Sequence, residues 1–356
     1  MKRILMIGTG GTIASEMTDA GLSPGLHGAD FLRYIPSVAS LCEVDCLQVC
    51  NIDSTNMTPD HWLAIAGAVE EHYNSYDGFV ISHGTDTMAY TAAALSYLIQ
   101  NSPKPIVLTG SQKPIHMEVT DSKTNLLDSF AVACDGRIPG VTVVFGGAII
   151  LGTRARKTYS KSFGAFSSIN YPALGIVQEG RVIPYIQPSA AASPTFYHSL
   201  NTRVSLVKLI PSVTATYLSF ALLESDAVIV ESYGVGGIPA GDQGSFYGLI
   251  RSACSQGKIV AMTTQVQNEG SDLSVYSVGH RLKSDLGVLE SCDMTLEAVV
   301  AKLMWCLAQT RDSGEVARLF YTPVAGDILC LPEDADGPHF VTKSGVLSCK
   351  VGGERV

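Results

Sequence analysis

The stretch Gly78-Phe-Val-Ile-Ser-His-Gly-Thr-Asp-Thr-Met88 decides the class of fold that the sequence predicts. Its first five residues form a short apolar run of the kind that makes a buried strand. A turn follows at His83-Gly84, and apolar residues then recur from Met88 to Ile99 at three- and four-residue spacing, as on one face of a helix. A strand that leads through a short turn into a helix is the repeating unit of a parallel α/β sheet.

The same alternation of strands and helices extends along the chain on both sides of this stretch. Further strands are expected at residues 3–8, 44–52, 105–109 and 141–145, and further helices after Thr58-Pro59 and at 125–133. Near residue 187 the pattern gives way to a small, proline-bearing, aperiodic stretch that is typical of a linker. A second series then begins, with strands expected at 204–209, 227–231 and 258–263 and helices at 245–256 and 295–309.

These patterns predict an α/β protein of two α/β domains. The larger N-terminal domain, over residues 1–187, is expected to hold a doubly wound, mostly parallel sheet, and residues 188–204 form the linker. A smaller parallel α/β domain is expected over residues 205–331, followed by a polar tail over 332–356. A length of 356 residues agrees with about two hydrophobic cores.

The composition restricts the class of function. A hydrophobic fraction of 46% and 34 glycines describe a packed globular protein with many turns. The net charge is −9 and there are no blocks of Lys and Arg, so neither nucleic acid nor an anionic membrane is expected as a partner. The first apolar run ends at Gly8, too short for a signal peptide, and no run approaches the roughly 18 residues of a membrane helix. We therefore expect a cytoplasmic protein.

The cysteines are more consistent with free thiols than with a metal site. Nine is an odd number, so they cannot all pair within one chain. Cys42, Cys46 and Cys50 recur at regular spacing, but no matching His or second Cys pair lies nearby for zinc. Buried free thiols are therefore the preferred interpretation, and neither a metal nor another cofactor is expected.

The turns at the carboxyl ends of the strands are the expected places for a ligand site. In the first such turn, Gly8-Thr-Gly-Gly-Thr-Ile-Ala-Ser15, a dinucleotide-binding fingerprint would require glycine where Ile13 stands. Asp30, near the distance of the ribose-binding acid, does not follow a strand, and the Gly-Lys of a P-loop is also missing. What remains is the hydroxyl of Thr12 at a strand end, either as a reactive group or as a local hydrogen-bonding residue.

A second turn joins a hydroxyl and a carboxyl group, Thr85 and Asp86, between a strand and a helix. The simpler interpretation is helix capping, and His83 is expected to be structural. Lys157 is either a solvated charge or, when buried beside a hydroxyl, a base. Because a threonine hydroxyl needs a base and an orienting carboxylate to act as a nucleophile, Thr, Lys and Asp together make a chemically sensible group.

These residues, in this order, resemble the bacterial-type L-asparaginases, and most closely their cytosolic type I branch. The resemblance extends from residue 9 to about residue 310, and its first and third segments are highly specific. The segments that carry it are Thr9-Gly-Gly-Thr-Ile-Ala-Ser15, Asp53-Ser-Thr-Asn-Met-Thr-Pro59, His83-Gly-Thr-Asp-Thr-Met-Ala-Tyr-Thr-Ala92, Leu108-Thr-Gly-Ser-Gln-Lys-Pro114, Ser232-Tyr-Gly-Val-Gly236 and Asp293-Met-Thr295.

The resemblance implies hydrolysis of L-asparagine to L-aspartate and ammonia, with Thr12 as the nucleophile. Thr85, Lys157 and Asp86 then resemble the second group, which assists proton transfer or the attack itself. Which threonine attacks stays open. The family's substrate clamp is matched by three residues: Asp53, Ser54 and Thr55. The amide or its oxyanion is expected to be held by backbone groups at Gly84, Thr85 and Ser111.

One position departs from the family pattern. A tyrosine is usual on the loop after the first turn, and Leu22 stands roughly in its place. Either another hydroxyl substitutes for it, or the enzyme is slower, or its natural substrate differs. Gly21 and Pro24 suit a closing lid. The family assembles as homodimers or homotetramers, and Asn268 or Glu269 is expected to reach across to a neighbouring subunit, with a solvated loop as the alternative.

Four other functions compete with an asparaginase. A preference for L-glutamine differs by one methylene and is not predictable from sequence. The ammonia-producing subunit of an archaeal tRNA-dependent amidotransferase has an additional N-terminal domain, for which a catalytic turn at residue 8 leaves no room. A catalytically weak amino-acid sensor on the same fold would not need to keep Thr12, Thr85, Asp86 and Lys157 together. An NAD-dependent oxidoreductase is disfavoured by Ile13.

Overall fold

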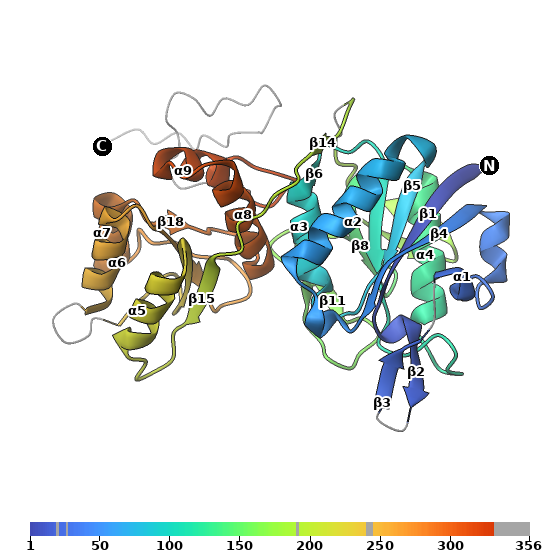
Figure 1. The fold of residues 1–356 in the computed structure, drawn as a ribbon, viewed down its shortest axis with the longest axis horizontal. Coiled ribbons are helices and arrows are strands. Elements are labelled where there is room, and N and C mark those ends of the chain that lie inside the picture. Colours follow the sequence, from blue (N-terminus) through green and yellow to red (C-terminus); the bar gives the residue numbers. More distant parts are fainter. Residues whose placement is uncertain (19–20, 26–27, 190–191, 240–244, 331–356) are drawn as a thin grey trace, which may run out of the picture.

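A computed structural model describes residues 1–18, 21–25, 28–189, 192–239 and 245–330. Figure 1 shows a larger and a smaller α/β unit side by side, with helix α8 of the smaller unit facing helix α3 of the larger one. The predicted fold class, two α/β domains with the larger one first in the chain, is confirmed.

The larger unit is built on an eight-stranded sheet in the order β13-β12-β9-β8-β7-β5-β1-β4. The five strands from β8 to β4 are parallel: β1 Lys2–Gly10, β4 Cys42–Ile52, β5 Gly78–Ser82, β7 Pro105–Thr109 and β8 Gly140–Phe145. The other three extend the sheet in antiparallel fashion: β9 Ala148–Leu151, β12 Gly175–Gln178 and β13 Arg181–Pro184. The bounds expected for β5 and β7 are confirmed, whereas the antiparallel edge was not predicted.

Helices cover both faces of this sheet. Helices α2 (Pro59–His72) and α3 (Met88–Leu98) lie over one face, and α1 (Gly28–Phe31) and α4 (Ser122–Asp135) over the other. In β5, Phe79 and Ile81 pack into the hydrophobic core under α2 and α3, while Val80 packs into the core under α1 and α4. Because side chains alternate along a strand, a strand buried on both faces must be apolar at every position, which explains the continuous run 78–81.

The smaller unit is a fully parallel four-stranded sheet in the order β15-β16-β17-β18. Its strands are β15 Val204–Lys208, β16 Ala227–Ser232, β17 Ile259–Thr264 and β18 Leu289–Glu290. One face is covered by α5 Ala215–Glu224, α6 Ser245–Ser255 and α7 Ser277–Leu286, and the other by α8 Leu296–Gln309 and α9 Ser313–Tyr321. Of these helices, α5, α7 and α9 were not predicted.

The two units share hydrophobic contacts. The core on the α2–α3 face of the larger sheet continues without a break through Tyr97 and Trp305 into the α8 face of the smaller sheet. The expected linker contains β14 (Thr195–Phe196), which pairs with β6 (Ile99–Gln100) of the larger unit. We keep the limits 1–187, 188–204 and 205–331 as a proposal, and the expected tail 332–356 lies outside the described residues.

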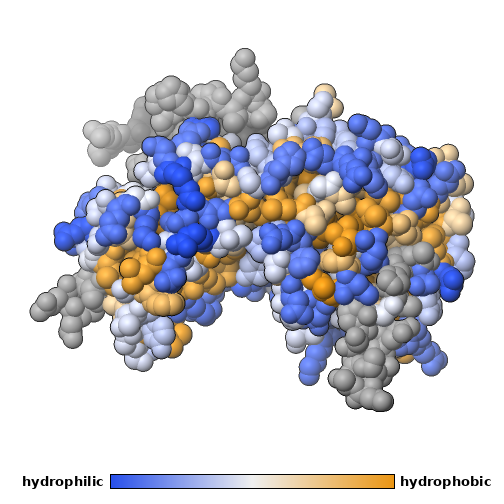
Figure 2. Space-filling view, viewed as in Figure 1, coloured by the Kyte–Doolittle hydropathy of each residue, from blue (hydrophilic) through white to orange (hydrophobic). Residues whose placement is uncertain are grey.

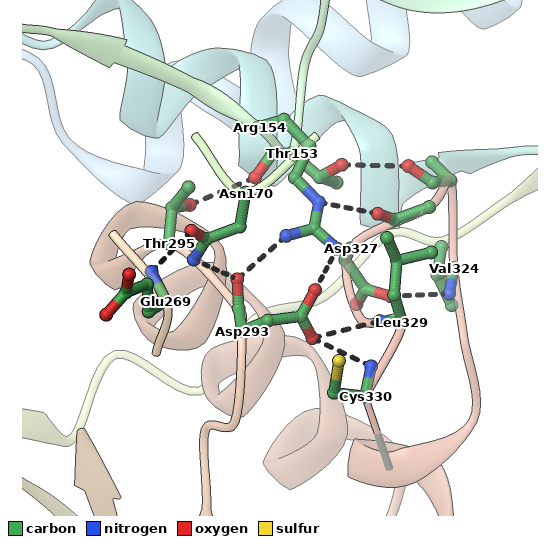
Figure 3. A network of polar contacts seen from close by, with 12 residues as sticks. Thr153, Arg154, Asn170, Glu269, Asp293, Thr295, Val324, Asp327, Leu329 and Cys330 are labelled. Atoms are coloured by element: carbon green, nitrogen blue, oxygen red, sulfur yellow. Dashed lines mark hydrogen bonds and ion pairs between the residues drawn. The ribbon is translucent and has the colours of Figure 1, made fainter. Parts of the chain in front are cut away.

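A buried polar network also joins the two units, and Figure 3 shows it. Arg154 is fully buried, and its guanidinium donates to Asp293 Oδ2 at 2.8 Å, to Asp293 O at 2.7 Å and to Gly326 O at 2.7 Å. Asp293 Oδ1 accepts from the backbone N–H groups of Leu329 and Cys330. We call Arg154, Asp293 and Gly326 the interdomain network. It anchors the segment that leads directly into β10 (Ala155–Lys157).

The remaining short elements surround these layers. They are 3-10 helices η1 Thr12–Ala14, η2 Pro36–Ser40, η3 Ser54–Asn56 and η4 Tyr73–Ser75, and strands β2 Ser15–Thr18, β3 Gly21–Pro24 and β11 Phe166–Ser168. The expected loop around Leu22 is an antiparallel hairpin of β2 and β3, with Met17 opposite Leu22. The side chains of this hairpin lie outside the described residues, so what replaces the tyrosine stays a prediction, as does the lid.

Candidate active site

Four strand-end turns meet at the carboxyl edge of the larger sheet. They follow β1, β4, β5 and β7, which are neighbours in the sheet. Gly11 has a φ of +81°, and a Cβ on it would collide with the backbone of Gly84. A Cβ on Gly84 would collide with Ser54, and one on Gly110 with the carbonyl of His83. Only glycine permits such close approach, so the turns pack directly against one another at these three glycines.

This packing brings together the turns after β1, β5 and β4, which we call the first, second and third turns; the turn after β7 is the fourth. Thr12 follows Gly11 at the start of η1 and is half-buried. Thr85, next to Gly84, is 5% exposed, and Ser54 is 2% exposed. The turn at Thr12 is held on its other side by the Gly11 N–H, which donates to Ile52 O at 3.0 Å.

Lys157 connects the hydroxyl and the carboxyl group of the second turn. Its Nζ donates to Thr85 Oγ1 at 2.7 Å and to Asp86 Oδ1 at 2.6 Å. The Lys157 side chain is 18% exposed, whereas that of Asp86 is 58% exposed. The lysine is therefore mostly withdrawn from solvent, and its ammonium faces a hydroxyl and a carboxylate. We call Thr85, Asp86 and Lys157 the hydroxyl–lysine group.

The capping interpretation of Thr85 and Asp86 is wrong. Helix α3 begins after Thr87, which is its N-cap and makes no side-chain cap hydrogen bond. Thr87 Oγ1 instead donates to Ser54 O at 2.7 Å, which ties the second and third turns together. Thr85 and Asp86 thus stand before the helix with their side chains committed to Lys157.

His83 is structural, as predicted. It is fully buried, and burial lowers its pKa to about 4 against the opposing effect of the hydrogen bond to Gly84 O. The ring is therefore neutral at pH 7. Its Nδ1 donates to Gly84 O at 2.7 Å, and its Nε2 accepts from Thr91 Oγ1 at 2.9 Å. This neutral ring fixes the peptide of Gly84 directly beside Thr85.

The predicted clamp residues shape the third turn. Asp53 is the N-cap of η3, and its Oδ1 accepts from the Thr55 N–H at 2.9 Å and from Thr55 Oγ1 at 3.0 Å. Ser54 is buried against Gly84, whereas Asp53 and Thr55 are exposed. Asp53 therefore orders the turn that presents Ser54, and it keeps a second carboxylate oxygen for a ligand.

The fourth turn contains the predicted Ser111 and also Gln112, which the sequence analysis did not single out. Ser111 is buried, and its Oγ donates to Lys113 O at 2.6 Å. The next residue, Gln112, accepts from Thr85 Oγ1 at 3.4 Å and donates to Ser162 O at 3.2 Å. Its backbone N–H is held by Asp121. Gln112 was not predicted because a glutamine side chain has no titratable group. Its position in a strand-end turn would have identified it as a candidate.

The two candidate cross-subunit residues lie elsewhere in the chain. Asn268 and Glu269 are exposed, and the Glu269 N–H donates to Asn170 Oδ1 at 2.8 Å, beside the interdomain network (Figure 3). In the described part of the chain, no hydrogen bond connects them with Thr12 or the hydroxyl–lysine group. Within one subunit they are not part of the site.

The site offers hydroxyls, the amine of Lys157, the carboxylates of Asp53 and Asp86, and backbone N–H groups. Among the described residues, no three His, Cys, Asp or Glu side chains gather as metal ligands. All eight described cysteines are free. No helix in the described ranges is both long and apolar enough to cross a membrane. The arrangement is suited to attack by a hydroxyl on a carbonyl, with proton transfer through the lysine.

Comparison with known proteins identifies both units. The family described as "Asparaginase, N-terminal" matches residues 3–190, and "Glutaminase/Asparaginase C-terminal domain" matches residues 203–320. An L-asparaginase of Thermococcus kodakarensis is 38% identical over 332 residues, covering 92% of this chain and 99% of the relative. One of the glutamyl-tRNA(Gln) amidotransferase subunits of Pyrococcus horikoshii is 31% identical over 91% of this chain and 76% of its own length.

A solved structure agrees with these sequence matches. The thermostable L-asparaginase from Thermococcus kodakarensis superposes with a TM-score of 0.86 at 37% identity, over 92% of this chain and all of the other. The similarity therefore includes the turns that form the candidate site as well as the smaller sheet.

Proposed function

The chain belongs to the asparaginase family, and we propose that it is an amidohydrolase that converts L-asparagine into L-aspartate and ammonia. The observation that carries the proposal is the hydroxyl–lysine group, in which Lys157 Nζ lies 2.7 Å from Thr85 Oγ1 and 2.6 Å from Asp86 Oδ1. The resemblance to L-asparaginases over most of the chain supports the substrate class.

In this proposal Thr12 attacks the carbon of the side-chain amide. Its turn lies against the turn of Gly84, which brings it beside the hydroxyl–lysine group. Lys157 takes the proton of the attacking hydroxyl through Thr85, and Asp86 stabilises the lysine's positive charge. The proton then passes to the leaving ammonia, and water releases aspartate from the acylated threonine. Gln112, within reach of Thr85 Oγ1, orients that hydroxyl.

Substrate binding is assigned to the other turns. The side chain of Ser54, with Asp53 and Thr55, receives the α-carboxylate and α-amino groups, and the exposed Asp86 adds a negative charge for the ammonium. Backbone groups at Gly84, Thr85 and Ser111 hold the amide oxygen as it becomes an oxyanion. Each such donor typically accounts for about 3 kcal/mol of transition-state stabilisation.

We further propose a cytoplasmic homodimer or homotetramer in which Asn268 or Glu269 completes a neighbour's site. Both residues are exposed and therefore free to meet a second subunit. The smaller unit presents large apolar side chains such as Phe220 and Leu223 of α5, which are 66% and 71% exposed. Figure 2 shows an apolar area on the visible face of this unit as well. Large exposed apolar areas commonly mark protein interfaces.

The experiment is ammonia release from L-asparagine, L-glutamine and D-asparagine by the native chain and by Thr12→Ala, Thr12→Ser and Thr85→Ala. We expect turnover of L-asparagine that falls at least about 10³-fold in Thr12→Ala and is partly retained in Thr12→Ser. Turnover that persists in Thr12→Ala but not in Thr85→Ala would transfer the nucleophile to Thr85. A folded native chain without any amidase activity would refute the enzyme and favour the amino-acid sensor.

Preference for L-glutamine is the second candidate. It is favoured by the description of the matched C-terminal domain, which names glutaminases beside asparaginases. One methylene changes transition-state binding by about 1–3 kcal/mol. The ratio of kcat/KM for the two amides in the same assay decides between the two, and a ratio above one for L-glutamine would replace our first choice.

A further inference from the structure

A pair of thiols joins the sheet of the larger unit to one of its helices, at the edge opposite the candidate active site. Cys42 is the first residue of β4, and Cys134 lies in the last turn of α4. Cys42 is 2% exposed in the core under α1 and α4, and Cys134 packs against the same core. A side-chain hydrogen bond connects the two thiols, and both are free. The two sulfurs therefore face each other, although the residues are far apart in the sequence.

A lysine lies beside this pair. Lys2 is opposite Cys42 in the parallel pairing of β1 with β4. Its Nζ is 3.8 Å from the point where a Cβ on Gly136, two residues after Cys134, would stand. Lys2 also makes an ion pair of 4.0 Å with Asp77. Its ammonium is thus placed between the start of β4 and the end of α4, where a positive charge favours the ionised form of a thiol.

The hydrogen bond and the lysine give the two thiols different chemistry. The hydrogen bond from Cys42 and the charge of Lys2 lower the pKa of Cys134, against the opposing effects of burial and of Asp77. The same hydrogen bond, together with burial, raises the pKa of Cys42. Cys134 therefore ionises first, while Cys42 keeps its proton. Because the thiolate is the nucleophile and Cys134 is partly exposed, a small oxidant can reach the reactive member of the pair.

We propose that Cys42 and Cys134 form a reversible disulfide when the protein is exposed to a hydroperoxide, with Cys134 as the attacking thiol and Cys42 as the resolving one. The Cys134 thiolate attacks one peroxide oxygen, so that an S–O bond forms, the O–O bond breaks, and an alkoxide or hydroxide leaves and is protonated by water. Cys42 then loses its proton, and its sulfur attacks the sulfenic sulfur of Cys134. The S–O bond breaks, and the departing hydroxide combines with that proton to form water. A dithiol reductant reverses the reaction.

The disulfide fastens the first residue of β4 to the last turn of α4. It closes a loop of about 90 residues, and a cross-link of this span stabilises a fold mainly by restricting the unfolded chain. The candidate site lies at the other ends of both elements. β4 leads into Asp53, and α4 begins after Asp121, whose carboxylate holds the Gln112 N–H. Oxidation therefore stabilises the larger unit at a distance from the site.

The test exposes the reduced full chain to hydrogen peroxide, blocks the remaining thiols with an alkylating reagent and maps the peptides by mass spectrometry. Trypsin and a protease that cleaves after glutamate place Cys42 in residues 34–43 and Cys134 in residues 124–137, apart from Cys46 and Cys50. We expect these two peptides to be linked, and dithiothreitol to separate them. The unfolding temperature of the oxidised chain should be several degrees above that of the reduced chain.

Cys46 is the matched internal control. It is also partly buried on β4, but burial and the charge of Asp45 raise its pKa to about 11, so it should stay reduced. Cys46→Ser should form the linked peptides as the native chain does. Cys134→Ser should form neither the link nor the more stable species, and Lys2→Met should slow the linkage several-fold. If Cys134→Ser does not fold, the peptide map of the native chain still identifies both partners.

Two results would overturn the proposal. Cys42 and Cys134 could both stay reduced in peroxide, or Cys134 could be oxidised to a sulfinic acid without a link to Cys42. Oxidation of Cys46 as fast as Cys134 would show that the pair has no special reactivity, and a linked chain that unfolds at the reduced chain's temperature would refute the stabilising effect. None of these measurements depends on amidase activity, so they are independent of the proposed function.

Discussion

Two polar clusters lie at the two ends of one short strand and differ in how completely their groups are satisfied. The interdomain network holds Arg154, just before β10, fully buried with three hydrogen bonds to Asp293 and Gly326. The hydroxyl–lysine group holds Lys157, at the end of β10, with two hydrogen bonds and with an exposed Asp86 beside it. Only two residues, Ala155 and Arg156, lie between Arg154 of the fully buried cluster and Lys157 of the partly exposed one.

The difference indicates which cluster serves structure and which serves chemistry. A buried charge must find its partners inside the protein, and Arg154 has a carboxylate and two backbone carbonyls there, away from solvent. A catalytic group needs partners that can change during a reaction. If this distinction holds, substitutions in the first cluster reduce stability and leave chemistry intact, while substitutions in the second do the reverse.

The largest expected effect is that of Lys157→Met on turnover. Removal of one member of a cooperating catalytic group typically costs about 10⁴-fold or more, and the loss here should appear in kcat for L-asparagine. The free energy of unfolding should change by less than about 1 kcal/mol, because the partner Asp86 is exposed. Lys161→Met, at an exposed neighbouring lysine, is the control and should remain active. Retention of a tenth of native kcat in Lys157→Met would remove the lysine from the mechanism.

The second expected effect is that of Asp293→Ala on stability. It leaves the Arg154 charge buried without its carboxylate, and such unpaired charges typically cost about 3–5 kcal/mol. Denaturant unfolding should show this loss, while kcat of the folded fraction stays within a few-fold of native. Glu315→Ala breaks an exposed ion pair with Arg318 and should shift the midpoint far less. Equal shifts of the unfolding midpoint for the two variants would mean that the buried ion pair stabilises the protein no more than an exposed one.

The sequence predicted most of the parallel strands, including the partly exposed edge strands β4 and β15, and it missed the short antiparallel strands of the larger sheet. β5 and β7 are buried at every position because each face lies under helices, and all their residues before the last Ser or Thr are non-polar. In β12 and β13, at the antiparallel end of the sheet, the pattern is mixed because these strands are only partly covered. Helix α5 was missed for a related reason. Its outer face carries Tyr217, Phe220 and Leu223, so its apolar residues do not follow one helical stripe.

The candidate site was predicted in part because its residues stand at strand ends. Thr12 and Thr85 could be selected from the positions of their turns alone, whereas Ser54 came from the family resemblance. The contact between Lys157 and Thr85 spans 72 residues, and it came from the family resemblance and not from local pattern. Arg154 and Asp293 are 139 residues apart, and the sequence around neither residue predicts that the two pair. Pairings of this kind follow from how the two sheets pack.

The third expected effect concerns His83, a fully buried residue that fixes the Gly84 peptide beside the hydroxyl–lysine group. Its folded pKa is about 4, below the unfolded value of about 6.5. As pH falls from 6.5 to 4, the unfolded chain binds a proton that the folded chain does not, so stability falls by about 3 kcal/mol over that window. Above pH 6.5 the ring is neutral in both the folded and the unfolded chain, so His83 causes no loss of stability there.

His83→Gln should therefore flatten the loss of stability between pH 6.5 and 4, even if it lowers stability at pH 7. Asp128, whose pKa is raised to about 6 by burial, acts in the opposite direction in both proteins and cancels in the comparison. Unfolding free energies measured by denaturant at several pH values provide the test. Parallel curves for the two proteins would contradict a neutral, buried His83.

The smallest expected effect is that of Thr295→Val, which removes an uncharged hydrogen bond between the two units, on the free energy of unfolding. Thr295 caps α8, since its Oγ1 accepts from the Ala298 N–H at 3.1 Å, and the same hydroxyl donates to Thr153 O at 3.0 Å. Thr295→Val keeps the shape but loses both bonds, at a cost of about 1–2 kcal/mol in unfolding free energy. Thr214 is the matched control, because it is the N-cap of α5 without a side-chain cap bond, and Thr214→Val should cost almost nothing. If both variants are equally stable, uncharged contacts between the units contribute little, and the junction depends on Arg154, Asp293 and the shared core.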